Sequence, residues 1–502
     1  MASLIHSLVG ALTGHTDTLC TVLADHGFQV EYPLSLSYTH DLNNYWSAAC
    51  SDLHPECTVS PRNAQEMADV IAALGHTQDQ FAVKSGGHSP NLGFSSTQGG
   101  VLVVTKNLDQ VVYDASTQTA VIGPGQRWED VQEKLEPTGR AVVGGRLGGV
   151  GVGGLLLGGG LSYLSPQYGW AANNILSYLS PQYGWAANNI LSYEVVLANG
   201  TLVNANAEEH SDLFAALKGG GGNFGVVTAY TVQTHPMDHP VWGGTYVFGG
   251  DKTEEMLAAL RDFVEYYPDE KASIILTREH ATLLNTWIMF LFYDGPSPPA
   301  GIFDNFTALN PLDQTKTWSS YADLLKNGDQ FILHGSRYSI AGETIPVPHD
   351  MSPTVLQSLF DFWLDVNNEV LLELGMVGTM DFQPLPRSIA QKALQRGGDL
   401  LDFPPDQDYI ALQITLQWLL STSDARMLDA TRTLFKGFNR LISQHIANGT
   451  LPDVYRPLYM NDIHADQDYW GRLRTRDRAL QTRRKYDPTG FFQTRTSGFR
   501  LS

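Results

Sequence analysis

The sequence predicts an α+β protein in which two differently built halves follow one another along 502 residues. In the first half, short β-like runs alternate with helices and with glycine-rich turns. From about residue 236 onward, longer strands are followed by long amphipathic helices, an order typical of one antiparallel sheet covered by helices. Apolar residues make up 43% of the chain and charged residues 17%, so the chain can bury a substantial core.

The elements of the first half are predicted from caps, breakers and short apolar runs. Residues 1–45 form a helical lead-in that runs into "DLNNYWSAAC". The next helix covers "SPRNAQEMADVIAALG", because Ser60 or Asn63 can cap its first turn and Gly75 can end it. A second helix, "RWEDVQEKLEPTG", is closed by a proline and a glycine. Strands are expected at 81–84, 101–105, 111–113 and 119–122, and in "YEVVLANGTLV", whose Asn-Gly pair signals a hairpin.

The elements of the second half are longer and more regular. Apolar residues at helical spacing predict helices over 253–267, 352–369 and 426–447. Strands are predicted over 272–280, 286–295 and 409–419, the first two as a pair. The last residues, 456–502, contain many aromatics and are expected to close over a surface that is already built. These changes of pattern divide the chain into residues 1–45, 46–235, 236–455 and 456–502.

Charge and cysteine content exclude several classes of function. The formal net charge is −20, which repels phosphate backbones and makes nucleic-acid binding an unlikely role. The glycine-rich residues 144–164 do not form a membrane span, since about half of them are glycine and Arg146 lies among them. The amino-terminal apolar run lacks a positive flank, which favours a cytoplasmic over a secreted location. The three cysteines contain no CxxC metal pair, and in a secreted protein the spacing of Cys50 and Cys57 would allow a bridge.

Three glycine-rich stretches point to a nucleotide cofactor. They are "KSGGHSPNLGF" (84–94), "GGRLGGVGVGGLLLGGGLS" (144–162) and "KGGGGNFGVVT" (218–228). Glycine lets backbone N–H groups approach a ligand closely, and several such loops can cradle a pyrophosphate without many cations. A nicotinamide fingerprint is a poorer fit, because "GVGVGG" lacks the strand–turn–helix setting and the acidic residue that follows it. His88, between Gly87 and Ser89, is the distinctive residue of the first stretch.

These stretches, together with the terminal "KYDPTGFF", resemble the FAD-linked oxidases with a PCMH-type FAD-binding domain. More narrowly, they resemble the berberine-bridge-enzyme-like members of fungal secondary metabolism. The resemblance covers nearly the whole chain, from "YWSAACSDLHPECTVSPRNAQEM" to the end. It implies a two-part FAD-binding domain at 46–235, a substrate-binding α+β domain at 236–455 and a terminal segment, 456–502, that returns to the FAD domain.

The resemblance also implies which residues hold the cofactor. The family's histidine in the GGH turn carries FAD through its 8α-methyl group, and that position is His88. The other implied cofactor-binding residues are Ser85, Gly86, Gly87, Ser89, Asn91, Gly151, Gly153, Gly154, Gly158, Gly159, Gly160, Ser162, Asn189, Ile190, Asn223, Gly225 and Val226.

Two positions depart from the family pattern. Relatives with two covalent links carry a cysteine three residues before the "VGVGG" run, where this chain has Leu147, so a single bond through His88 is expected. Many relatives carry a Tyr-x-Asn-Tyr motif near the carboxyl terminus, which supplies a base. Here the counterpart is "YMND", which retains Tyr459 and Asn461 as catalytic candidates but lacks the second tyrosine. A tyrosine that is simply part of the core is the alternative interpretation of Tyr459.

Residues 161–175 are repeated letter for letter as 176–190. Two perfect copies do not make a solenoid, and either copy alone would complete the family pattern. The repeat therefore reflects a recent in-frame duplication or an error in the gene model. We expect residues 158–162 and 188–190 to keep their places, with the middle extruded.

The implied function is a flavin oxidase acting on a small, polycyclic or aromatic metabolite of a biosynthetic pathway. FAD would take a hydride from substrate carbon, and oxygen would reoxidise it to give hydrogen peroxide. The alternatives are a flavoprotein cyclase with little net oxidation and a non-catalytic product spoiled by the duplication. Substrate and oxygen are the expected partners, with no nucleic acid and no membrane span. The substrate domain offers Trp287, Arg337 and Tyr338 as polar or aromatic candidates, each also explicable as a structural residue.

Overall fold

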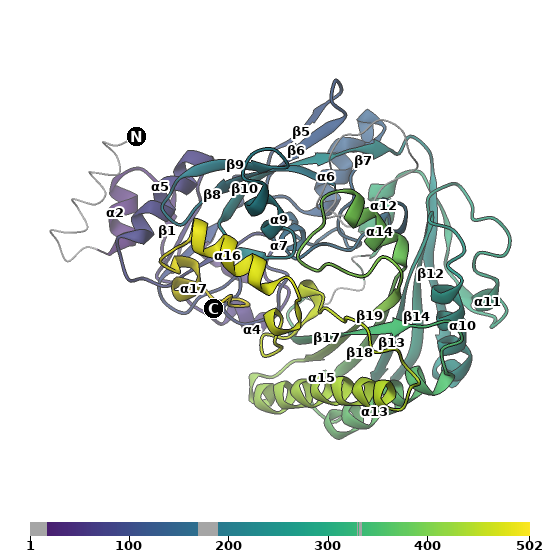
Figure 1. The fold of residues 1–502 in the computed structure, drawn as a ribbon. Coiled ribbons are helices and arrows are strands. Elements are labelled where there is room, and N and C mark those ends of the chain that lie inside the picture. The colour runs from purple at the N-terminus through teal and green to yellow at the C-terminus, as the bar shows by residue number, and fades with distance from the viewer. Residues whose placement is uncertain (1–17, 169–188, 329, 331–333) are drawn as a thin grey trace.

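The computed structural model describes residues 18–168, 189–328, 330 and 334–502 (Figure 1). A large sheet built from the second half of the chain lies against two smaller sheets built from the first half (Figure 1). The predicted α+β class is confirmed. No helix among the described residues is both long enough and apolar enough to cross a membrane.

The first half contains two small sheets. One has the strand order β1-β2-β4-β3, with β4 parallel to both β2 and β3, and the other is antiparallel with the order β5-β6-β10-β8-β9. Their strands are β1 (Val30–Glu31), β2 (Cys57–Val59), β3 (Phe81–Lys84), β4 (Val101–Val104), β5 (Val111–Asp114), β6 (Thr119–Ile122), β8 (Ile190–Val196), β9 (Leu202–Asn206) and β10 (Val226–Gln233). A short pair, β7 (Arg140–Ala141) and β11 (His235–Pro236), leads into the second half.

The helices of the first half follow the predicted caps. The expected helices correspond to α5 (Ala64–Gly75) and α6 (Trp128–Leu135). Asn63 caps α5, since its side chain accepts a hydrogen bond from the Glu66 N–H at 2.9 Å. The remaining helices here are α2 (Leu19–Asp25), α3 (Leu36–Asn43), α4 (Ala48–Ser51), α7 (Val152–Leu157), α8 (Ser165–Tyr168) and α9 (Ser211–Leu217).

The second half forms an eight-stranded antiparallel sheet among the described residues. Its order is β15-β12-β14-β13-β18-β19-β17, and β16 pairs with β12. The strands are β12 (Val241–Gly249), β13 (Ala272–Ala281), β14 (Leu284–Tyr293), β15 (Leu312–Asp313), β16 (Lys316–Trp318), β17 (Arg337–Val347), β18 (Val377–Leu385) and β19 (Asp408–Trp418). The predicted pair of strands is the β13–β14 hairpin.

One face of this sheet is covered by long helices. Apolar side chains of α10 (Thr253–Glu265), α13 (Pro353–Val370) and α15 (Asp424–Ala447) share a core with alternate residues of the strands, such as Leu276, Phe382 and Leu412 (Figure 1). Because side chains alternate across a strand, the intervening residues point to the opposite face. The shorter helices of this half are α11 (Asp304–Thr307), α12 (Tyr321–Gly328) and α14 (Arg387–Gln395).

The carboxyl-terminal segment packs back on the first half. It contains α16 (Arg476–Tyr486) and α17 (Phe491–Arg495), which lie beside the amino-terminal elements in Figure 1. Phe491 and Phe492 pack against Phe81 of β3, with ring centroids 5.4 and 6.4 Å away. Arg495 donates hydrogen bonds to the carbonyl oxygens of Thr77 and Asp79.

The cysteine pairing is not the Cys50–Cys57 bridge that the spacing would allow. A disulfide joins Cys20 to Cys57, with the two Cα atoms 6.1 Å apart, and Cys50 is free and buried. Cys20 lies on α2, which packs in the same apolar cluster as β2, the strand that begins at Cys57. Cys50 instead lies on α4, where its Sγ faces the carbonyl oxygens of Ser89 and Pro90 at 3.6 and 3.7 Å.

Both outer ends of the duplicated segment are part of the core. Leu161 and Leu164 of the first copy, and Asn189 and Ile190 of the second, are 4% exposed or less. Lys392 of α14 holds the first copy by donating to the carbonyl oxygens of Pro166 and Gln167. The expected extrusion of the middle concerns residues 169–188, which lie outside the described part of the chain.

Candidate active site

A cavity of about 590 Å³ lies between the glycine-rich loops of the first half and the uncovered face of the large sheet. All three glycine-rich stretches contribute to its wall, although they are far apart in the sequence. The predicted cofactor residues that line it are Ser85, Gly86, Gly87, His88, Ser89, Asn91, Gly151, Gly153, Gly154, Asn223, Gly225 and Val226. The fold thus brings most of the predicted set together around one space.

The glycines are needed because two loops touch backbone to backbone. A Cβ atom added at Gly86 would lie 2.6 Å from the Cα of Gly151, so neither position tolerates a side chain without movement. Gly87 has φ of +66°, in the left-handed region that favours glycine. Arg127 ties the loops together, since its guanidinium donates to the carbonyl oxygens of Gly86 and Gly149. A cradle of side-chain-free backbone facing a large cavity fits a dinucleotide such as FAD.

His88 stands in the cavity wall as the end of an aromatic stack. Its ring lies on Trp46, with centroids 4.6 Å apart and planes 9° from parallel. Trp46 in turn stacks on Tyr338 of β17 at 4.3 Å and 23°. Enclosure within the protein, together with the positive charge of Arg127, lowers the pKa of His88 to about 4. The imidazole is therefore neutral at neutral pH, with a lone pair available on the ring.

Trp46 is a site residue that the sequence analysis misses. It lies just before α4, in "DLNNYWSAAC", and its N–H donates to the Gly87 carbonyl at 3.0 Å. An aromatic residue before a short helix carries no motif, so only the fold reveals its contact with His88.

Two predicted amides, Asn91 and Asn223, line the cavity but direct their side chains to the carboxyl-terminal segment. Asn91 donates to the Ile463 carbonyl and accepts from the Ala465 N–H, both at 2.9 Å. Asn223 donates to the carbonyl oxygens of Gly220 and Phe499, at 2.8 and 3.0 Å. These amides fasten the terminal segment to the cofactor loops.

Six predicted cofactor residues are not among those that line the cavity, and for them a cofactor role stays a prediction. They are Gly158, Gly159, Gly160, Ser162, Asn189 and Ile190. The glycine turn makes room for the terminal segment, since a Cβ atom at Gly158 would overlap the side-chain amide of Asn461. Asn189 is buried at the start of the β8 region, where its Oδ1 lies 2.8 Å from Nε2 of His235.

The two predicted catalytic residues, Tyr459 and Asn461, bind each other. Nδ2 of Asn461 donates to the Tyr459 hydroxyl at 3.0 Å and to the Leu155 carbonyl at 3.1 Å. The Tyr459 hydroxyl also accepts from the Leu161 N–H at 2.9 Å. Burial raises the pKa of Tyr459 well above its ordinary value, with a further contribution from the negative charge of Asp462. Both residues line the cavity, but a phenol that resists ionisation is a poor base at neutral pH.

The substrate-domain candidates fall into two groups. Tyr338 lines the cavity and closes the stack on Trp46. Trp287 is fully buried on the helix-covered side, next to Phe360 at 5.9 Å. Arg337 forms ion pairs with Asp52 and Asp424 at 2.5 and 2.6 Å, so its role is structural.

The sheet contributes a polar wall that the sequence analysis does not predict. The residues that β13, β18 and β19 present there are Thr277, Glu279, Thr379, Asp381, Gln383, Gln413, Thr415 and Gln417. Asp462 and Arg146 reach the same cavity from the terminal segment and the second glycine stretch. Their positions in the sequence are too scattered for a motif, and strand pairing alone brings them together.

The three carboxyl groups of this wall, those of Glu279, Asp381 and Asp462, all have pKa values raised by burial. Burial raises the pKa of Asp381 to about 7, and a hydrogen bond from Thr277 opposes the shift while the charges of Asp462 and Glu279 add to it. Burial raises the pKa of Asp462 to about 6, against the positive charge of Arg146 and a hydrogen bond from Gln383. Such carboxyl groups in a cavity are typical of acid–base sites.

Leu147 also lines the cavity, so no thiol is available at the position where the family can form a second flavin bond. Cys50, the free cysteine, is not among the lining residues.

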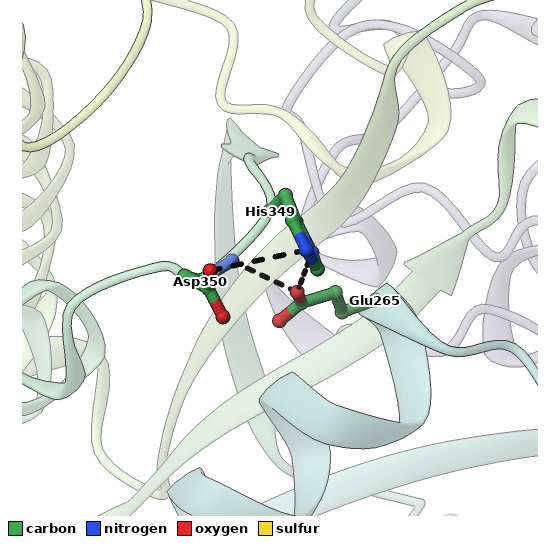
Figure 2. A group of neighbouring side chains, drawn as sticks. All are labelled: Glu265, His349 and Asp350. Atoms are coloured by element: carbon green, nitrogen blue, oxygen red, sulfur yellow. Dashed lines mark hydrogen bonds and ion pairs between the residues drawn. The ribbon is translucent and has the colours of Figure 1, made fainter.

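A separate cluster of potential metal ligands lies at the end of α10. It consists of Glu265, His349 and Asp350 (Figure 2). Oε1 of Glu265 accepts hydrogen bonds from the His349 ring and, at 2.8 Å, from the Asp350 N–H. None of the three lines the cavity, and their mutual hydrogen bonds account for the cluster without an ion.

Comparison with known proteins agrees with this geometry. A family model described as "FAD binding domain" matches residues 55–178. The chain is 48% identical over 488 residues to an uncharacterized FAD-linked oxidoreductase of Arthroderma benhamiae, covering 96% of this chain and 94% of the relative. It is 37% identical over 520 residues to the FAD-dependent monooxygenase prx3 of Penicillium roqueforti, covering 99% and 96%.

Solved structures share the fold at low identity. The wild-type BBE-like 1 protein of Physcomitrella patens superposes with a TM-score of 0.75 at 18% identity, covering 96% of this chain and all of that one. A variant of berberine bridge enzyme gives a TM-score of 0.74 at 16% identity, covering 99% of each chain.

Proposed function

Since this chain belongs to the berberine-bridge-enzyme-like family of FAD-linked oxidoreductases, we propose that it is an oxidase carrying one covalent FAD on His88. It is an enzyme and a flavoprotein, as its relatives are. The proposal adds the single bond, the oxidase reaction and the kind of substrate. The observation that carries it is the meeting of His88, three glycine stretches and a polar sheet face around one cavity.

Three features support a single bond through His88. The ring faces the cavity, it is neutral because burial lowers its pKa to about 4, and Trp46 holds it flat. Leu147 in the wall leaves no second attachment point. Arg127 and the paired glycines Gly86 and Gly151 would hold the cofactor's loops in register.

When bound, FAD would supply two-electron oxidation of substrate carbon, with oxygen as the final electron acceptor and hydrogen peroxide as the second product. The chain's own residues orient the substrate between the cofactor loops and the polar wall. Tyr459 and Asn461 hold the terminal segment against the residues of the second glycine stretch, through the Leu161 N–H and the Leu155 carbonyl. Small metabolites of a biosynthetic pathway are the proposed substrates. The polar wall favours members with hydroxyl, amine or carbonyl groups over bare hydrocarbons.

The reaction is tested by oxygen uptake and peroxide release from the purified yellow protein. The probe compounds are benzyl alcohol, benzylamine and methyl β-D-glucoside. An oxidase consumes oxygen and releases an equal amount of peroxide with at least one of them. Conversion of a probe without oxygen uptake would contradict the oxidase proposal and show that the electrons pass to another acceptor.

A further inference from the structure

Asp462 is held by its backbone at the edge of the cavity. It ends a short turn, Met460–Asp462, and its N–H donates to the Tyr459 carbonyl at 3.1 Å. On its other side lies Gly342 of β17, where an added Cβ atom would come 2.8 Å from the Asp462 carbonyl oxygen. The turn therefore packs directly against the sheet. This contact fixes the backbone of Asp462 at the cavity wall, which its side chain lines.

Gln383 fixes the orientation of the Asp462 carboxylate. Its Nε2 donates to Oδ2 of Asp462 at 2.8 Å, while its Oε1 accepts a hydrogen bond from the Arg146 guanidinium. Arginine has no acceptor, so Oε1 of Gln383 must face Arg146 and the NH₂ group must face Asp462. Gln383 is 1% exposed and cannot turn away into solvent.

The second carboxylate oxygen of Asp462, Oδ1, is the one available to a substrate in the cavity. Among the described residues, Oδ1 accepts no hydrogen bond, whereas Oδ2 is held by Gln383. Arg146 donates to Gln383, and no ion pair within the described residues joins it to Asp462. One oxygen is thus anchored and the other faces the space in which a substrate would lie.

Of the two aspartates, Asp462 has the more available oxygen, because both carboxyl oxygens of Asp381 accept hydrogen bonds, from Thr277 and Thr379. Burial raises the pKa of Asp462 to about 6, so this group is ionised at neutral pH and close to the range in which a base works best. Oδ1 of Asp381 accepts from Thr277 at 2.5 Å, and burial raises the pKa of Asp381 to about 7. Besides Arg146, the titratable groups facing this pair are Glu279 of β13 and Tyr459, whose raised pKa keeps it neutral.

We propose that Asp462, whose Oδ2 is held by Gln383, is the catalytic base that takes the substrate's proton. This inference rests on the proposed oxidase function. The O–H or N–H bond of the substrate breaks, its proton goes to Oδ1 of Asp462, and its electron pair forms a C=O or C=N bond. The hydride leaves the adjacent carbon for the oxidant, FAD, so the substrate loses two electrons and two hydrogens overall. An alcohol or amine bearing hydrogen on the oxidised carbon is the substrate class that this step requires.

The first test measures the carboxyl group itself in the holoenzyme. Protein labelled with [4-¹³C]aspartate is titrated from about pH 4.5 to 8 by infrared difference spectroscopy, as wild type, Asp462→Asn and Asp453→Asn. We expect a carboxyl that ionises near pH 6 and is missing only in Asp462→Asn. Asp453 is the control because it is exposed and precedes Asp462 by only nine residues in the sequence. An Asp462 already ionised at about pH 4.5, or still protonated at about pH 8, overturns the proposal.

The second test measures anaerobic flavin reduction by the three probe compounds. We expect Asp462→Asn to be roughly 100-fold slower, with unchanged flavin content, and Asp462→Glu to recover part of the rate. The wild-type rate should rise about tenfold per pH unit below pH 6 and level off above it, because the base must be ionised. A rate for Asp462→Asn within about threefold of wild type overturns the assignment of Asp462 while leaving the oxidase proposal intact. Wild-type protein that binds FAD but is reduced by none of the probes counts against the oxidase proposal, and the titration still decides the ionisation of Asp462.

Discussion

At the scale of single residues, the proposed bond between His88 and the flavin depends on the stack of His88, Trp46 and Tyr338. A bond to the flavin needs the imidazole to face the cofactor in one orientation, and a flat aromatic neighbour at 4.6 Å enforces it. Tyr338 supports Trp46 from the substrate side at 4.3 Å. The stack thereby joins three distant parts of the chain at the proposed point of attachment.

Replacing Trp46 by alanine should lower the fraction of covalently bound flavin several-fold. The ring of His88 would lose its stacking partner and sample orientations that cannot form the bond. Flavin fluorescence of the denatured protein on a gel, relative to protein stain, measures this fraction. Trp46→Phe is the matched control, since it keeps an aromatic face. Equal covalent flavin in Trp46→Ala and wild type would show that the stack has no role in attachment.

Replacing Asp381 by asparagine should stabilise the protein at about pH 8 by roughly 1–3 kcal/mol, and by about a third as much at about pH 5. The folded pKa of about 7 lies above the unfolded value, so the folded state binds this proton more tightly. Stability is therefore lost as the pH rises through the unfolded and then the folded pKa, and the neutral amide avoids that loss. Urea unfolding of both proteins at the two pH values measures the difference. A variant less stable than wild type at about pH 8 would contradict the raised pKa.

At the scale of elements, caps and periodicity predict the helices well and some strands poorly. Asn63 and the apolar spacing that follows it define α5, and long amphipathic patterns define α13 and α15. Strand β17 escapes prediction because its sequence, "RYSIAGETIPV", contains a glycine and a proline. The proline is tolerated because β17 is the edge of the sheet.

The candidate site is predictable only where a local motif marks it. His88 and the glycines Gly86 and Gly151 carry such a motif and line the cavity. Asp381 and Asp462 are 81 positions apart and meet through sheet register and the returning terminal segment, neither of which leaves a local signal. The pattern of the glycine turn 158–160 predicts a ligand loop, and the structure adds that Gly158 leaves room for the side-chain amide of Asn461.

Deleting residues 176–190 should preserve the fold and the flavin content. The deletion joins Ile175 to Leu191, which repeats the present junction because the two copies are identical. Closing a connection fifteen residues shorter should raise the free energy of unfolding by about 1 kcal/mol. Thermal unfolding and the flavin-to-protein absorbance ratio test this. Loss of flavin in the deletion variant would show that the second copy has a function of its own.

At the scale of the whole molecule, the cavity exists because the carboxyl-terminal segment packs back against the first half of the chain. The large sheet supplies one wall, the glycine loops supply the other, and residues 456–502 fasten them through Asn91, Asn223 and Arg495. Asp462 and Tyr459 reach the cavity on this same segment. The site is therefore complete only when the terminal segment is packed in place.

The most direct test of the central claim is whether flavin stays with the protein after acid precipitation. Wild type should give a yellow, fluorescent pellet with about one flavin per chain, and His88→Ala a colourless pellet from protein that still binds FAD before denaturation. A colourless wild-type pellet, or a yellow pellet from His88→Ala, would contradict attachment through His88.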